Sequence, residues 1–89
     1  MRNTRELAKG KWHGILTQLG IDPSYLNGRH GPCPMCQGKD RWRFDDKLQG
    51  GEWICNQCGN GDGFDLLMGV RDCGFKEAAA AVDEVVGEA

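Results

Sequence analysis

The sequence predicts a small α+β domain, with a short antiparallel β-hairpin and helices on either side of it. Stretches near both ends repeat apolar side chains every three or four positions, as amphipathic helices do. Residues 39–55 alternate apolar and polar side chains instead, which is typical of a half-buried hairpin. At 89 residues and 39% hydrophobic content, the chain is long enough for one domain with a modest core.

The first element is expected to be a single helix over residues 4–19. Asn3 and Glu6 have the spacing of a capping box at its start, and Gly20 ends it. Residues 21–32 follow as a mixed connector that is too short to fold alone. The apolar stripe of the helix is Trp12, Ile15, Leu16 and Leu19.

Four cysteines stand in the pattern C-x2-C-x18-C-x2-C, at Cys33, Cys36, Cys55 and Cys58. A two-residue gap places both sulfurs of a pair on one side of a metal atom, and four thiolates satisfy the tetrahedral preference of Zn²⁺. The spacing falls in the range that is typical of zinc sites. We therefore expect one structural zinc, whose binding would contribute ~10–16 kcal/mol to folding of the middle of the chain.

Other uses of paired cysteines remain open, namely a disulfide, a thiol redox pair or an iron–sulfur site. The charged first twenty residues lack the apolar core of a secretory leader, so a reducing cytoplasm is the expected compartment. Cys73 lies outside the spacing and is expected to be a free thiol. His30 could replace one cysteine as a ligand, although four thiolates already complete the set.

In the hairpin, Trp42 and Phe44 are expected on one face and Arg41 and Arg43 on the other. Gly38 and Gly59 follow the two cysteine pairs, where glycine permits the positive φ of a tight metal-binding turn. Two strands alone are marginal in water, so the hairpin needs the metal and a covering helix.

Two further helices are expected after the zinc ribbon of residues 33–60, within residues 61–89. Asp62 and Asp65 fit the N-cap and first turn of a short helix that carries Leu66, Leu67 and Val70. The second helix is predicted over residues 75–86. Its apolar stripe is Phe75, Ala78, Ala79, Val82, Val85 and Val86.

Charge is divided unevenly along the chain. Residues 1–47 hold nine Lys/Arg against five Asp/Glu, and residues 48–89 hold two against eight, giving +4 and −6. Four thiolates with one Zn²⁺ would bring the net charge to about −4. The basic half suits contact with nucleic acid, while the acidic half argues against a purely electrostatic binder.

The runs HGPCPMCQGKDRWRFDD and GEWICNQCGNGDGFDLLM, over residues 30–68, resemble the zinc-binding domain of phage and prophage DNA primases of the primase-helicase type. The chain is more distantly similar to the zinc domain of the bacterial replicative primase. The resemblance implies that the domain reads single-stranded template DNA and holds template and primer for a polymerase or helicase domain of the same or another chain. It also implies replication in the cytoplasm of a bacterial host cell. No membrane contact is expected, because the sequence has no apolar run long enough to cross a bilayer.

The resemblance places the metal ligands on the four cysteines named above. It places the signature basic and polar positions of the family on His30, Lys39, Asp40, Arg41 and Arg43. Glycine is common in the family where this chain has Gln37. In the family, side chains just before the third cysteine contact the template. This chain has Gly50, Gly51 and Glu52 there, so the family's base recognition by those positions cannot be carried over to this chain.

A single-strand binder needs guanidinium or ammonium groups for phosphates and a surface on which a base can stack. Trp53 is equally suited to core packing and to base stacking, and Asp40 is expected to orient a neighbouring arginine. The expected DNA-binding set is Arg29, His30, Lys39, Arg41, Arg43 and Trp53.

Two other function classes compete with a template reader. The first is a zinc ribbon that docks through its acidic helical half on a replication protein, and the second is a thiol oxidoreductase. We see no phosphate-binding G-x-x-x-x-G-K-[ST] loop and no acidic cluster suited to nucleotidyl transfer, so this chain alone is not expected to be an enzyme.

Overall fold

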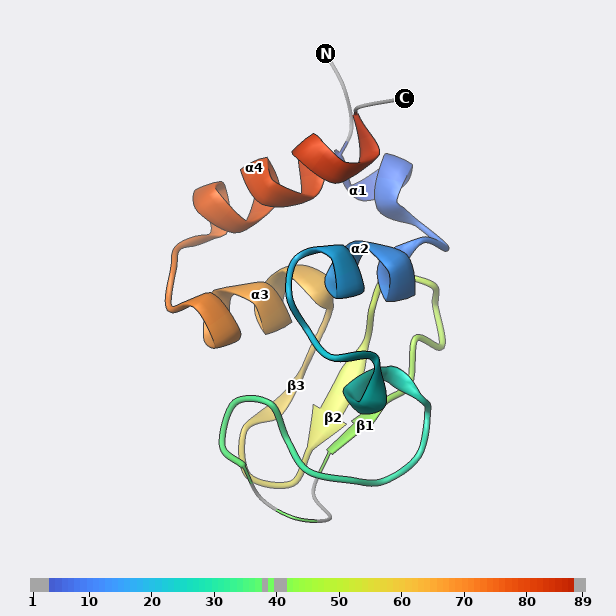
Figure 1. Ribbon diagram of the computed structural model, residues 1–89, viewed down its shortest axis with the longest axis vertical. Helices are drawn as coiled ribbons and strands as arrows, with labels where there is room; N and C mark the ends of the chain where they lie inside the picture. Colours follow the sequence, from blue (N-terminus) through green and yellow to red (C-terminus); the bar gives the residue numbers. More distant parts are fainter. Residues whose placement is uncertain (1–3, 38, 40–41, 88–89) are drawn as a thin grey trace.

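A layer of helices packs on one end of a three-stranded sheet in the computed structural model, which describes residues 4–37, 39 and 42–87 (Figure 1). The helices are α1 (Thr4–Ala8), α2 (Trp12–Gln18), α3 (Gly63–Arg71) and α4 (Phe75–Val86), with a 3-10 turn, η1 (Pro23–Leu26). The strands are β1 (Trp42–Phe44), β2 (Trp53–Cys55) and β3 (Gly59–Gly61), in that order and antiparallel. The α+β prediction is confirmed.

The prediction of a single N-terminal helix is wrong, because the helix is interrupted between α1 and α2. Gly10 adopts a φ of 78°, and its N–H donates to the carbonyl of Gln49 in the hairpin loop at 2.8 Å. The broken helix lets α1 pack against α4, where the Thr4 hydroxyl donates to Asp83 at 3.3 Å (Figure 1). Asn3, the expected cap, lies outside the described residues.

The connector is more ordered than its composition indicates. Asp22 caps η1 by accepting a hydrogen bond from the Ser24 N–H at 2.9 Å. Ile21 and Leu26 are buried and join the core. The segment therefore covers one side of the sheet before the first cysteine pair.

The sheet confirms the expected hairpin and adds a strand that the sequence analysis missed. Trp42 and Phe44 are buried and Arg43 between them faces outward, as the alternation predicts. In register across the three strands, Arg43 lies opposite Ile54, and Ile54 lies opposite Asn60. Two carboxylates order the loop that joins β1 to β2. The Glu52 side chain accepts from the N–H groups of Leu48 and Gly50, and the Asp46 side chain accepts from that of Gly51.

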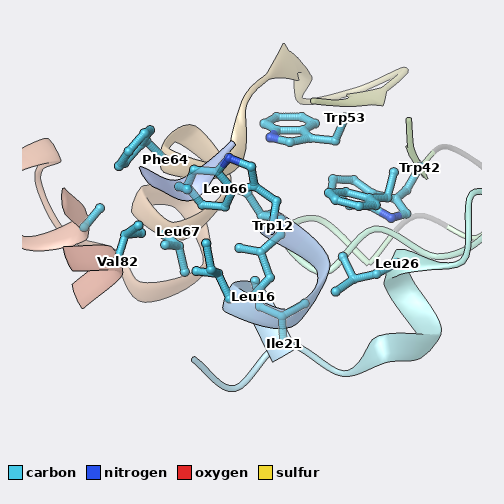
Figure 2. Close-up of a cluster of buried hydrophobic side chains, with 14 of the residues drawn as sticks. Trp12, Leu16, Ile21, Leu26, Trp42, Trp53, Phe64, Leu66, Leu67 and Val82 are labelled. Atoms are coloured by element: carbon cyan, nitrogen blue, oxygen red, sulfur yellow. The ribbon is translucent and has the colours of Figure 1, made fainter. Parts of the chain in front are cut away.

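Tryptophans connect the sheet to the helices (Figure 2). The Trp42 and Trp53 rings stack with centroids 5.3 Å apart, and Trp12 meets Phe64 edge-on at 4.9 Å. The indole N–H of Trp42 donates to the Tyr25 carbonyl at 2.6 Å, and that of Trp53 donates to the Asp62 carbonyl at 2.8 Å. Each buried indole N–H of this stacked pair is thus satisfied by backbone from another element.

The C-terminal helices follow the predicted signals closely. Asp62 and Asp65 form a capping box at the start of α3, and α4 has the predicted bounds. Leu66 and Leu67 are buried, as expected for the apolar stripe. Val70 and Phe75 are not core residues, because 40% and 51% of their surfaces stay exposed at the turn between α3 and α4.

Gly63 shows how tightly the start of α3 packs against α2, because a Cβ at this position would collide with the indole ring of Trp12. We expect Gly63→Ala to lower the free energy of unfolding by ~1–3 kcal/mol through overpacking. Gly14 of α2 is the matched control, since a Cβ there meets nothing within 4 Å. Gly14→Ala should leave the stability unchanged or raise it by up to ~1 kcal/mol through helix propensity. Thermal unfolding of both zinc-loaded variants by circular dichroism tests this, and equal melting temperatures would contradict the packing argument.

Candidate metal centre

Four thiols converge at one end of the sheet. The Sγ atoms of Cys33 and Cys58 are 3.9 Å apart, those of Cys36 and Cys55 are 3.7 Å apart, and all four lie within 4.8 Å of one another. A tetrahedral zinc with Zn–S bonds of ~2.3 Å has sulfurs separated by ~3.8 Å. These sulfurs are also much too far apart for disulfides, which need ~2.05 Å. The arrangement therefore fits one tetrahedral metal ion.

Each cysteine pair forms a tight turn that presents two sulfurs on the same side. In the first turn, the Cys36 N–H donates to Cys33 Sγ at 3.4 Å, and in the second the Cys58 N–H donates to Cys55 Sγ at the same distance. Cys33 and Cys55 are buried, Cys36 is half-buried and Cys58 is exposed. Cys55 ends β2 and Cys58 follows in the turn to β3, so the hairpin itself sets their spacing.

The residue after each pair has a positive φ. Gly59 adopts 101° and Gln37 adopts 65°, in equivalent positions of the two turns. The positive φ in the first turn therefore falls on a glutamine, at the position where glycine is common in the family that the sequence resembles. Gly38, which we expected to serve this purpose, lies outside the described residues. L-residues adopt this conformation at a cost of roughly 1 kcal/mol, which glycine avoids.

Without a metal, the thiols compete with one another for ionisation. Burial raises the pKa of Cys33. Burial and the neighbouring sulfurs raise the pKa of Cys58 to about 12. Burial also acts to raise the pKa of Cys55, but the backbone N–H groups of Cys58 and Gln57 outweigh it and bring that pKa down to about 7. A bound cation deprotonates its thiol ligands, so metal uptake releases protons and weakens as the pH falls.

Neither Cys73 nor His30 belongs to the four-thiol cluster. Cys73 is a partly buried free thiol whose Sγ lies 4.0 Å from the Leu67 carbonyl, between α3 and α4. His30 is exposed and is not part of the cluster found among the described residues. The prediction of a four-cysteine site that excludes Cys73 and His30 agrees with this geometry.

The expected DNA-binding residues differ in their exposure to solvent and in their position on the fold. Arg29, His30 and Lys39 are exposed on the segments that flank the first cysteine pair, and Arg43 lies on the outer face of β1. Asp40 and Arg41 lie outside the described residues. Trp53 is only 5% exposed and its ring is stacked on Trp42, so it has no free face for a base.

A shallow depression of about 490 Å³ lies on the outer face of the sheet, a feature that the sequence analysis did not find. Arg43, Ile54 and Asn60 form a row across it, one from each strand. Asn60 was missed because β3 was not expected, whereas Ile54 lies on a strand of the expected hairpin. The alternation of buried Trp53 and Cys55 around Ile54 was the available signal for an outward side chain.

One known family matches the ribbon. Residues 28–64 match the family model described as the zinc-binding domain of primase-helicase. The match covers both cysteine pairs, the sheet and the start of α3, and it leaves α1, α2 and α4 outside. It bears out the resemblance that the sequence motifs indicate, and with the four-sulfur geometry it identifies the centre as a structural zinc site.

No solved structure matches this chain. None of the described helices is long and apolar enough to cross a membrane.

A cysteine of the four-thiol cluster and the free thiol Cys73 should respond differently to substitution by serine. We expect Cys55→Ser to lose zinc and unfold the sheet, because Cys55 supplies one corner of the tetrahedron and ends β2. Cys73→Ser should keep one zinc per chain and the native fold. Native mass spectrometry and amide NMR spectra of both variants measure this, and loss of metal from Cys73→Ser would overturn the ligand assignment.

The paired turns give a second test. Gln37→Gly should relieve the positive φ at Gln37 and raise the stability of the zinc-loaded domain by up to ~1 kcal/mol, or tighten zinc binding by up to ~5-fold. Gly59→Ala is the mirror variant and should have the opposite effect, because its new Cβ meets nothing within 4 Å and only backbone strain is added. Competition with a chromogenic zinc chelator reports both. Effects of the same sign would show that the turn conformation is not the cause.

Proposed function

We propose that this chain is the zinc-binding domain of a phage-type DNA primase-helicase and that it recognises single-stranded template DNA during primer synthesis. The observation that carries the proposal is the family match over residues 28–64, which centres on the four-cysteine site. In this proposal the zinc holds the fold and takes no part in chemistry. Primer synthesis belongs to a polymerase domain of the same or another chain.

Phosphate contacts are assigned to the basic side chains beside the first cysteine pair. Arg29 and Lys39 are exposed there, with His30 next to them. Arg41 and its orienting partner Asp40 remain in the proposed set on sequence grounds. Trp53 is withdrawn from it, because its stacking on Trp42 and its hydrogen bond to the Asp62 carbonyl hold it in the core.

Binding by the isolated domain should be weak. With a net charge near −4 when zinc is bound, the chain has only a local basic surface for a polyanion. Attachment to a polymerase that already holds template raises the effective concentration of the domain, which converts a weak preference into a choice of start site. The proposal thus places the domain as a reader that works in tandem with a catalytic partner.

Docking on a replication protein is the second candidate function. It is favoured by the exposed apolar side chains of Val70 and Phe75 at the turn between α3 and α4. This surface lies outside the matched segment. A docking module would not depend on the basic residues near the first cysteine pair, which separates the two candidates.

A salt titration tests the template-reading proposal. Wild-type zinc-loaded protein should bind short single strands with a log–log salt slope of roughly −2 to −3, at ~0.7 per phosphate contact. Arg29→Ala/Lys39→Ala should reduce the slope by ~1.4 and weaken binding, because two contacts are lost. Fluorescence anisotropy at several salt concentrations measures both quantities.

Lys9→Ala/Lys76→Ala is the matched control for this experiment. It removes the same charge from exposed positions, one just after α1 and one in α4, and should keep the wild-type slope. Equal slopes for all three proteins, or a wild-type slope near zero, would leave docking as the better account.

A further inference from the structure

We propose that the outer face of the sheet forms a subsite for one unstacked nucleobase, built by Arg43, Ile54 and Asn60. The inference rests on the proposed function, and it assigns phosphate binding and base binding to two different surfaces of the domain. The basic residues near the first cysteine pair hold phosphates, and the sheet holds a base.

The three side chains are placed together by strand register. Arg43 on β1, Ile54 on β2 and Asn60 on β3 are direct cross-strand partners, so they project to the same side of the sheet. Neighbouring strands are ~4.8 Å apart, and the row therefore spans roughly 10 Å. It crosses the depression of about 490 Å³, which lies within the size range of small-ligand sites.

The charge of this depression suits a neutral ring better than a phosphate. Arg43 and Lys47 line it together with Asp45 and Glu52, so two cations face two anions. A phosphate would gain little there, because the two carboxylates offset the two cations. A base carries donors and acceptors but no net charge, which matches a lining of this kind.

Arg43 has hydrogen-bonding capacity that the fold leaves unused. Its Nε is buried, and among the described residues it has no hydrogen-bond partner. An unmet buried donor is costly, and turning the guanidinium outward onto an acceptor of a base would remove that cost. Arginine and asparagine are also among the side chains that make paired hydrogen bonds with base edges.

Ile54 provides the apolar surface of the subsite. It is 42% exposed in the middle of the central strand, between two buried neighbours. Since Trp42 and Trp53 are committed to the core, Ile54 is the side chain of this row on which a base can rest. An aliphatic surface stacks less well than an aromatic one, which agrees with weak binding by the isolated domain.

The experiment compares two six-nucleotide probes by fluorescence anisotropy, oligo-dT and a strand of equal length with abasic sites in place of the bases. Ile54→Tyr should tighten oligo-dT binding at least ~5-fold through stacking and leave the abasic strand unchanged. Leu48→Tyr is the matched control, because Leu48 is an exposed apolar residue of the neighbouring loop that does not line the depression. Arg43→Lys should weaken oligo-dT binding at an unchanged salt slope, because the charge is kept and the planar donor set is lost.

The outcomes separate this inference from the function on which it rests. If wild type binds neither probe at low salt, the template-reading proposal fails and the subsite fails with it. If wild type binds both probes equally, and Ile54→Tyr matches Leu48→Tyr, phosphate binding stands and the base subsite is overturned. A gain confined to Ile54→Tyr and to the base-bearing probe supports the subsite, and misfolding cannot produce it.

Discussion

The convergence of four thiols on one point is the constraint on which the other features of this fold depend. The two cysteine pairs lie far apart in the sequence, and a bound cation stabilises their close approach because it is the counter-charge for thiolates that would otherwise stay protonated or repel one another. Cys55 pairs with Trp42 on one side and with Gly59 on the other. The candidate metal site is therefore attached to the sheet at a position where all three short strands pair. Strands of three residues have little stability of their own, and this attachment explains how the sheet persists.

The tryptophans connect the sheet to the connector and to the helices. Trp42 and Trp53 stack beneath the sheet and donate to carbonyls of η1 and of the α3 N-cap, so the ribbon, the connector and α3 are held in one arrangement. Trp12 fits only because Gly51 and Gly63 leave room for its ring. One consequence is functional. With these large aromatic rings taken into the core, the outer face of the sheet is left to an arginine, an isoleucine and an asparagine, which sets the chemistry available to a ligand there.

Several carboxylates of the chain have a structural role that the net charge does not reveal. Asp62 and Asp65 cap α3, and Asp46 and Glu52 accept hydrogen bonds from the backbone of the hairpin loop. These carboxylates satisfy local N–H groups of the backbone. The basic residues beside the first cysteine pair remain exposed by contrast. Part of the acidic charge therefore serves helix capping and loop ordering, while the basic residues beside the first cysteine pair face solvent.

The amino-acid sequence by itself indicated the two cysteine pairs, the alternation of β1, the N-cap of α3 and the bounds of α4, because each of these features is encoded by residues a few positions apart. The family resemblance followed from the same local motifs and is matched over residues 28–64. Only the tertiary structure decided the break at Gly10, the pairing of β3, the burial of Trp53 and the exposure of Phe75. Gly10 bonds to a loop about forty residues away, and β3 is two glycines around one asparagine, without a strand signal of its own. Whether an apolar side chain is covered depends on which remote segment packs over it, and local periodicity carries no information about that partner.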